Sequence, residues 1–130
     1  VPAMQQGFRP NVISTDLHAD SMNGGMKDLC NVLSKFLNMG MSLPDAILRA
    51  TWNPANVNHR TELGHLSPGA EADVAILNLR KGDFGFLDIR KTKMKGSQKL
   101  ETELTLRAGK VVWDLNGISA PAWESELPKK

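Results

Sequence analysis

Hydrophobic residues change their spacing along the first forty positions of the chain. Residues 11–15 contain two adjacent β-branched apolar side chains, a pattern typical of a short buried strand. Residues 19–25 are mostly polar and contain two adjacent glycines, which predicts a loop. From Met26 onward the apolar residues recur every three or four positions, the period of one face of a helix. Gly40 follows this pattern and predicts where the helix ends.

Two further helices are predicted before residue 60. Ser42 is followed three positions later by Asp45, which resembles a capping box, and helical spacing then continues to about Ala50. Asn53 precedes a proline, and proline is favoured in the first turn of a helix. We therefore expect Asn53 to cap a short third helix over residues 54–57.

The second half of the chain predicts strands. Residues 72–77 are apolar at nearly every position, so we expect a strand buried on both faces. Residues 84–87 and 100–106 predict two more strands, separated by a basic loop over residues 90–98. A tight turn then leads into residues 111–113, which predicts a hairpin.

Composition narrows the class of protein. A chain of 130 residues has room for one ordinary domain with a core, and no apolar run approaches the ~20 residues that span a bilayer. The single cysteine, Cys30, excludes an intramolecular disulfide and is expected to be a buried, inert thiol. The first residues, Val1-Pro2-Ala3, lack the basic and apolar regions of a signal peptide. These features predict a cytoplasmic protein that does not bind a membrane.

Positive charge is concentrated in one part of a chain whose net charge is only +2. Residues 80–110 contain nine Lys or Arg residues and four Asp or Glu residues. A phosphate-binding surface is one interpretation, and a solvated hairpin is the favoured one. Because no aromatic residues alternate with the basic ones, we expect no nucleic-acid partner.

The predicted elements do not form a complete fold. A strand at residues 11–15 needs neighbouring strands for its backbone groups, and nothing else before residue 72 is expected to pair with it. The pattern therefore indicates an α/β fragment, in which the last strand–helix unit of a larger sheet or barrel precedes a small β domain. The boundary is predicted near residue 60.

Chemically capable side chains follow the predicted strand. Asp16 stands at its carboxyl end, where α/β folds place active sites, and His18 comes two residues later. Asp16 is either a catalytic carboxylate or a residue that caps the loop or the next helix. His18 either orients a substrate or faces solvent. Asp16, His18 and Asp20 alternate and could form a small metal site, although zinc ligands usually come from separated segments. His59 and His65 are expected at the surface.

Four stretches of the chain resemble the C-terminal portion of the amidohydrolase superfamily of metal-dependent hydrolases, in its deacetylase and dihydroorotase-like branch. Residues 13–18 (ISTDLH) are similar to the end of the final barrel strand with its aspartate, and residues 51–55 (TWNPA) are similar to the helix start that follows. Residues 63–77 (LGHLSPGAEADVAIL) resemble the return into a β-sandwich, and residues 106–114 (LRAGKVVWD) its last hairpin.

The resemblance implies a definite fold. Residues 1–60 correspond to the end of a TIM-type (β/α)8 barrel, with its last strand and the helices that follow. Residues 61–130 correspond to the C-terminal strands of a small composite β-sandwich. The remaining barrel strands and the other sandwich strands are absent from this sequence.

The resemblance also implies a chemistry. In a complete enzyme of this kind, hydrolysing an amide-type, non-peptide C–N bond of a small molecule, Asp16 would be a metal-site carboxylate and the general base and acid. His18 is the candidate substrate-binding residue, and zinc is the expected metal. The family's His-x-His pair does not occur, since the only histidines are His18, His59 and His65. We therefore expect the isolated chain to be inactive and to need the missing N-terminal portion of the enzyme.

An alternative from a different class remains open. The chain could be a non-catalytic, self-associating fragment or interaction module. In that case the strand at residues 11–15 and the apolar helix faces would be buried against a second copy, most simply in a two-fold dimer.

Overall fold

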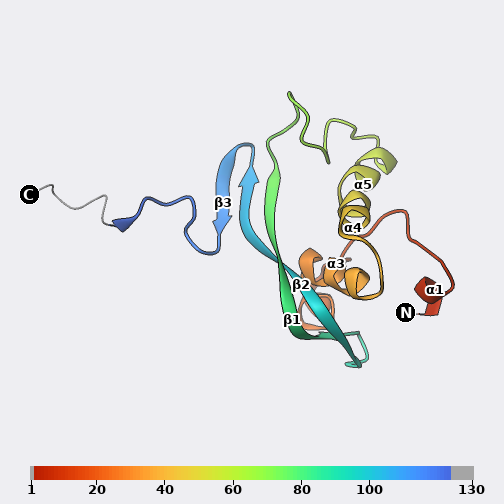
Figure 1. The fold of residues 1–130 in the computed structure, drawn as a ribbon. Coiled ribbons are helices and arrows are strands. Elements are labelled where there is room, and N and C mark those ends of the chain that lie inside the picture. Colours follow the sequence, from red (N-terminus) through yellow and green to blue (C-terminus); the bar gives the residue numbers. More distant parts are fainter. Residues whose placement is uncertain (1, 124–130) are drawn as a thin grey trace, which may run out of the picture.

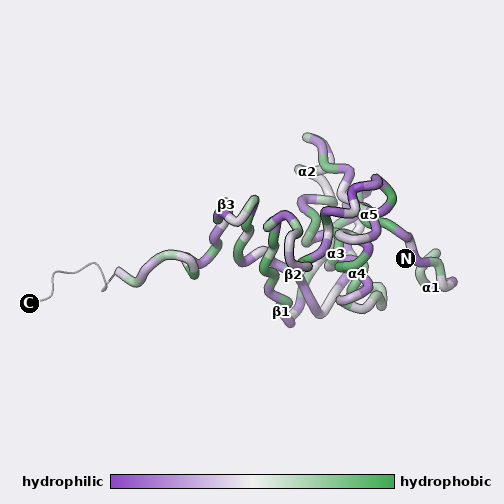
Figure 2. The backbone as a smooth tube through the Cα atoms, turned by 90° about the horizontal axis from the view of Figure 1, so that it is seen from above, coloured by the Kyte–Doolittle hydropathy of each residue, from purple (hydrophilic) through white to green (hydrophobic). Residues whose placement is uncertain are grey.

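Helices cover one side of a three-stranded antiparallel sheet in a computed structural model that describes residues 2–123 (Figure 1). Seen from above, the helices lie on one side of the sheet and residues 115–123, after its last strand, lie on the other (Figure 2). Among the described residues, no helix is both long and apolar enough to cross a membrane. The elements in chain order are α1 (Pro2–Gln5), α2 (Ala19–Asn23), α3 (Leu29–Asn38), α4 (Leu43–Ala50), α5 (Trp52–Val57), β1 (Val74–Leu87), β2 (Lys93–Arg107) and β3 (Lys110–Asp114).

Local signals account for α3 and α4, and both predicted helices are confirmed. The carboxylate of Asp28 caps α3 by accepting a hydrogen bond from the Asn31 amide at 2.6 Å. Ser42 Oγ accepts from the Asp45 amide at 3.3 Å and so caps α4 as predicted. Gly40 has a φ of 92°, the left-handed conformation that glycine adopts without strain after a helix end.

Two short segments near the N-terminus differ from the prediction. Residues 19–25 were expected to be a loop, but Ala19–Asn23 form the single helical turn of α2, which His18 precedes as N-cap. Residues 11–15 were expected to be a strand, and no strand is formed there. A strand exists only when a neighbouring strand takes its hydrogen bonds, and the bond found here joins the Ile13 amide to the Arg49 carbonyl of α4 at 2.8 Å.

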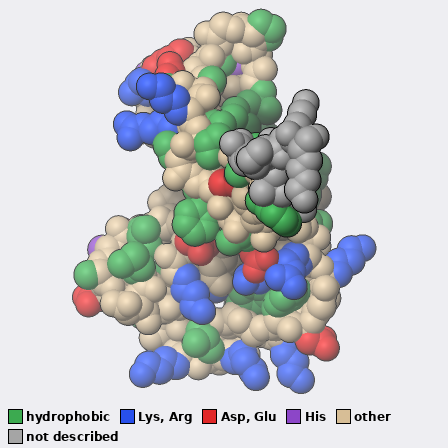
Figure 3. All heavy atoms as spheres, turned by 90° about the vertical axis from the view of Figure 1, so that its left-hand side faces the viewer, with side chains coloured by type: hydrophobic (Ala, Val, Ile, Leu, Met, Phe, Trp, Pro, Cys, Tyr) green, Lys and Arg blue, Asp and Glu red, His purple; other side chains and the backbone are tan. Residues whose placement is uncertain are grey.

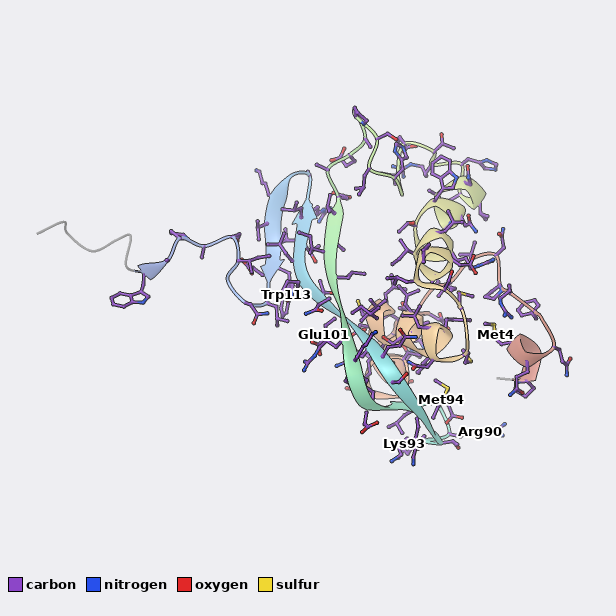
Figure 4. The ribbon with its side chains drawn as sticks, in the orientation of Figure 1. Met4, Arg90, Lys93, Met94, Glu101 and Trp113 are labelled. Atoms are coloured by element: carbon purple, nitrogen blue, oxygen red, sulfur yellow. The ribbon has the colours of Figure 1, made fainter. Side chains whose placement is uncertain are left out.

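The β1–β2 hairpin is longer than predicted. The strands expected at residues 72–77 and 84–87 are one strand, β1, whose register with β2 shifts between Lys81 and Phe84. The basic residues 90–98 lie largely within β2 and are not a loop from end to end. Lys93, Met94 and Arg90 lie at the tip of this hairpin, the end far from β3 (Figure 4). The predicted final hairpin, β2 with β3, is confirmed.

Polar side chains of α3 bind the edge of β2 that β1 leaves free. Ser34 is fully buried, and its Oγ accepts a hydrogen bond from the Leu100 amide at 2.9 Å. One turn later, Asn38 donates to the Gln98 carbonyl at 2.7 Å and accepts from the Ser97 amide at 2.8 Å. A helix thus covers a strand edge that would otherwise expose unpaired backbone groups.

The hydrophobic core lies between the helices and the face of the sheet that the helices cover. Leu100 of β2 packs in one buried cluster with Leu33 and Leu37 of α3 and with Met4 of α1, so the core crosses the domain boundary expected near residue 60. The opposite face of the sheet is open, and Figure 3 shows hydrophobic and basic side chains together on the side that β3 faces. Ile76 is 45% exposed there, so the prediction that residues 72–77 are buried on both faces is wrong.

Candidate active-site segment

Residues 10–21 form the segment that carries Asp16, the predicted catalytic residue. Asp16 is exposed and has a φ of 47°, an uncommon conformation for a residue other than glycine. Its amide donates a hydrogen bond to Ser14 Oγ at 3.4 Å. No hydrogen bond or ion pair to its carboxylate is found within residues 2–123. The side chain is therefore free to meet a group from outside the described structure.

Three hydrogen bonds from the junction of α4 and α5 hold the start of this segment. The Arg49 guanidinium donates to the Pro10 carbonyl, and the Arg49 carbonyl accepts from the Ile13 amide at 2.8 Å. The side-chain amide of Asn53 donates to the Asn11 carbonyl at 2.7 Å. Three of the four residues before the Ser14–Asp16 turn are therefore bound to two helices that lie about forty positions further along the chain.

Sequence reasoning missed both anchoring residues. Asn53 was expected to cap a third helix over residues 54–57, but α5 begins two residues earlier, at Trp52, with Thr51 as its N-cap, and the Asn53 side chain binds Asn11 instead. Arg49 gave no signal beyond its place in the last turn of α4, where its Nε lies 3.0 Å from Asp45 Oδ1. Only the folded chain reveals what these two side chains bind.

Ser21 closes the other end of the segment. Its Oγ accepts a hydrogen bond from the His18 amide at 2.9 Å and lies 3.0 Å from the Asp16 carbonyl, to which it donates. His18 is exposed and occupies the N-cap position of α2. The backbone on both sides of Asp16 is thus held by side-chain hydrogen bonds, whereas the Asp16 and His18 side chains remain accessible.

The described residues do not form a metal site by themselves. Across residues 2–123, no three His, Cys, Asp or Glu side chains lie close enough together to hold an ion. This includes Asp16, His18 and Asp20, whose alternation in the sequence raised that alternative. A metal bound at Asp16 would need most of its ligands from elsewhere, since zinc takes three or four protein ligands.

The linker after α5 returns to the same helix junction. Trp52, the first residue of α5, contacts His65 edge to face, with ring centroids 5.5 Å apart. Gly64 has a φ of 77°, and a Cβ there would lie 2.6 Å from the Thr51 carbonyl oxygen, so only glycine fits. His59 is exposed as expected, but His65 is half-buried against Trp52 and is not a free surface residue.

A groove with a volume of about 670 Å³ lies away from Asp16. It runs between the start of α3 and the strands β2 and β3, with Cys30, Glu101 and Trp113 among its lining residues (Figure 4). Burial raises the pKa of the Cys30 thiol, which also lies 3.3 Å from Thr102 Oγ1. A raised pKa keeps the thiol protonated and unreactive at neutral pH, in agreement with the expected inert role.

Basic residues beside this groove are partly neutralised. Lys99 and Arg80 each bind a different oxygen of Glu101, at 2.9 Å and 3.0 Å, and these hydrogen bonds lower the pKa of that carboxyl group. The outer face of the hairpin is therefore a mixed-charge surface around Glu101. This arrangement favours the solvated-hairpin interpretation over a phosphate site.

Comparison with known sequences gives a family match and three relatives of this chain. A sequence profile of the amidohydrolase family matches residues 1–112. The chain is 38% identical to a deacetylase of Brucella anthropi and 35% identical to a deacetylase of Agrobacterium fabrum, in each case over 86 residues. Each match covers 66% of this chain and 21% of the relative. A deacetylase of Enterococcus faecalis is 26% identical over 110 residues, which are 84% of this chain and 30% of that protein.

Two solved structures are similar to this chain in fold. An adenine deaminase superposes with a TM-score of 0.80 at 25% identity, over 87% of this chain and 31% of that one. A dihydroorotase superposes with a TM-score of 0.77 at 28% identity, over 85% of this chain and 30% of that one. The chain thus spans about a fifth to a third of the length of these relatives.

The comparisons concern two features of the chain, its fold and its dependence on a metal. The mixed α/β arrangement described above matches part of known amidohydrolase structures. The family is typically metal-dependent, but the described residues supply no complete ligand set. Since the family profile extends over most of the sequence, the chain belongs to the amidohydrolase family and corresponds to a minor portion of its relatives.

Proposed function

We propose that this chain is the C-terminal part of a metal-dependent amidohydrolase of the deacetylase type, which hydrolyses an amide-type, non-peptide C–N bond of a small molecule. The observation that carries the proposal is the accessible Asp16 carboxylate at the end of a segment that α4 and α5 hold in place. A scaffold that fixes the backbone and leaves the carboxylate free suits a catalytic group.

The proposal assigns a place in the complete fold to each half of the chain. Residues 11–15 form the last strand of a (β/α)8 barrel once neighbouring strands from the rest of the protein take up their backbone groups. Residues 1–60 are then the end of the barrel, and residues 61–130 are the C-terminal part of a composite β-sandwich. The open sheet face around Ile76 supports this division, because such a face is usually covered.

Asp16 is the proposed proton-transfer residue. It accepts a proton from the attacking water and then donates one to the leaving nitrogen, as a positioned carboxylate does in general acid–base catalysis. His18 lies two residues further on and is the proposed contact to the substrate. Zinc is the proposed metal, with Asp16 as the one ligand from this chain and the others from the missing N-terminal portion.

A chimera tests this function. The full 130-residue chain replaces the corresponding stretch of the Brucella anthropi deacetylase, and hydrolysis of N-acetylated amino acids is measured in the presence of zinc. We expect the chimera to turn over substrate and the isolated chain to show no turnover, because one carboxylate does not make a site. A folded chimera without activity, or an active isolated chain, contradicts the proposal.

A second arm of the experiment tests the same function without fusing the two proteins. The remaining part of the Brucella anthropi deacetylase is expressed as a separate polypeptide and mixed with the isolated chain. Recovery of activity only in the mixture supports the view that the chain completes a site. Recovery without the added chain contradicts it.

One observation favours the alternative of a self-associating module. The side chains of Ile76, Val112 and Trp113 are 45%, 59% and 52% exposed on the strands of the sheet. Exposed apolar side chains on a sheet can become a contact surface when a second chain covers them. If a second copy covers them, the isolated chain sediments as a dimer, and Val112→Lys and Trp113→Lys return it to a monomer. A wild-type monomer at 100 μM, roughly the concentration at which a weak contact of ~5 kcal/mol begins to populate, contradicts this alternative.

A further inference from the structure

The junction of α4 and α5, here called the helix corner, holds the backbone of the Asp16 segment by specific hydrogen bonds. Three of its hydrogen bonds to that segment are to backbone groups, at the Pro10 and Asn11 carbonyls and at the Ile13 amide. Backbone contacts of this kind fix the path of the chain whatever its side chains are. Three of them within four residues leave little freedom before the turn that presents Asp16.

The geometry points to Asn53, with Arg49, as a positioning residue that sets the location of the Asp16 carboxylate. This inference rests on the proposed function, since it gives Asp16 a chemical task. Asn53 acts through the backbone: its amide nitrogen lies 2.7 Å from the Asn11 carbonyl oxygen and 3.2 Å from Asn11 Oδ1. Four residues separate Asn11 from Asp16, and one of them, Ile13, is itself bound to α4.

One of the two anchoring side chains is itself held in place. Arg49 projects from the last turn of α4, and Asp45, one turn earlier, binds its Nε at 3.0 Å. Asn53 is carried by the first turn of α5, whose first residue, Trp52, packs against His65. A side chain whose surroundings restrict it transmits its position to the atom that it binds.

Downstream of Asp16 the loop is closed independently. Ser21 Oγ donates to the Asp16 carbonyl, and Asp16 has a φ of 47°. A residue in this conformation persists where the structure on both sides determines it. If the upstream anchor is lost, Asp16 keeps its link to Ser21, but its distance from the helix corner is no longer defined.

The chemistry of the contact requires a donor at position 53. An asparagine amide donates to the Asn11 carbonyl, whereas an aspartate of the same shape presents only acceptor oxygens. Asn53→Asp therefore removes the bond and sets two oxygens against each other without a change of size. Asn58→Asp is the matched control, because Asn58, the C-cap residue of α5, donates to the Pro54 carbonyl at 2.8 Å and has no hydrogen bond to residues 10–16 among the described residues.

The first test uses the 130-residue chain and needs no activity. Amide hydrogen exchange is followed by NMR, with the amides of α3 and β2 as the measure of overall stability. Asn53→Asp is expected to speed exchange at Ile13 and its neighbours about tenfold relative to those reference amides, and Asn58→Asp to change it less than about twofold. Asn53→Gln, which keeps a donor, restores part of the protection. Equal exchange at Ile13 in the Asn53→Asp and Asn58→Asp chains overturns the inference.

The second test uses the chimera. A displaced catalytic group costs turnover more than binding, so Asn53→Asp is expected to lower kcat by about 10- to 100-fold and to change KM by less than about threefold. Asn58→Asp leaves both values near those of the parent. A fall in kcat that is the same for both variants overturns the positioning role. An inactive parent chimera counts against the proposed function alone, because the exchange experiment still decides whether Asn53 holds the segment.

Discussion

The chimera with Asp16→Asn is expected to hydrolyse its substrate about 10²- to 10⁴-fold more slowly than the parent chimera, the range that a positioned acid–base group contributes. Asparagine has the shape of aspartate but neither accepts nor releases a proton at neutral pH. Asp16 is exposed, and its carboxylate has no partner among residues 2–123, so the substitution breaks no described contact. Steady-state kinetics on the purified variants measure the change, with kcat as the main readout.

A control for charge and for folding accompanies this variant. Asp83→Asn removes one negative charge from an exposed position at the register shift of β1, far along the chain from the Asp16 segment. It is expected to leave kcat and the thermal unfolding midpoint unchanged. If Asp16→Asn retains more than about a tenth of the parent kcat, Asp16 is not the proton-transfer residue, because general acid–base catalysis is worth more than that.

Leu100→Ala is expected to lower the free energy of unfolding of the 130-residue chain by about 2–5 kcal/mol, the cost of a cavity in a packed core. Leu100 is 2% exposed and lies in the buried cluster between α3 and the sheet. Its amide is bound by Ser34 Oγ, so its backbone cannot shift far to fill the space that the side chain leaves. Urea unfolding followed by circular dichroism gives the difference.

Ile76→Ala is the matched control on the same sheet. It removes an aliphatic side chain from β1 that is 45% exposed, and we expect a cost below about 1 kcal/mol. Equal costs for the two variants would mean that the helices do not pack on β2 as described.

The family and the helices could be predicted from the sequence because their signals are local. The cap that Ser42 makes with the Asp45 amide and the helix end at Gly40 involve neighbours in the chain, and both are confirmed. The extent of β2 was missed even though a signal existed. Met94 and Gly96 face the helices while Lys93 and Lys95 face outward, an alternation typical of a strand, but the density of lysines suggested a loop.

The candidate site was predicted only in part. Asp16 and His18 remain predictions as functional residues, and their position at the end of a segment followed from the order of residue types. The strand expected at residues 11–15 failed because this chain contains no neighbour to pair with it in the described structure. The sequence could not show that Asn53 binds the Asn11 carbonyl. An asparagine followed by a proline is also the usual signal for a helix cap.

The sequence by itself determined membership of the amidohydrolase family, the α3 and α4 helices and the carboxylate on which the proposed chemistry depends. Tertiary structure alone decided that Arg49 and Asn53 hold the backbone ahead of that carboxylate, and that α3 covers the free edge of β2 through Ser34 and Asn38. The physical reason is the distance along the chain. A cap or a turn is specified by residues three or four positions apart, whereas these hydrogen bonds join groups about 40 to 66 positions apart and form only when packing has brought the two segments together.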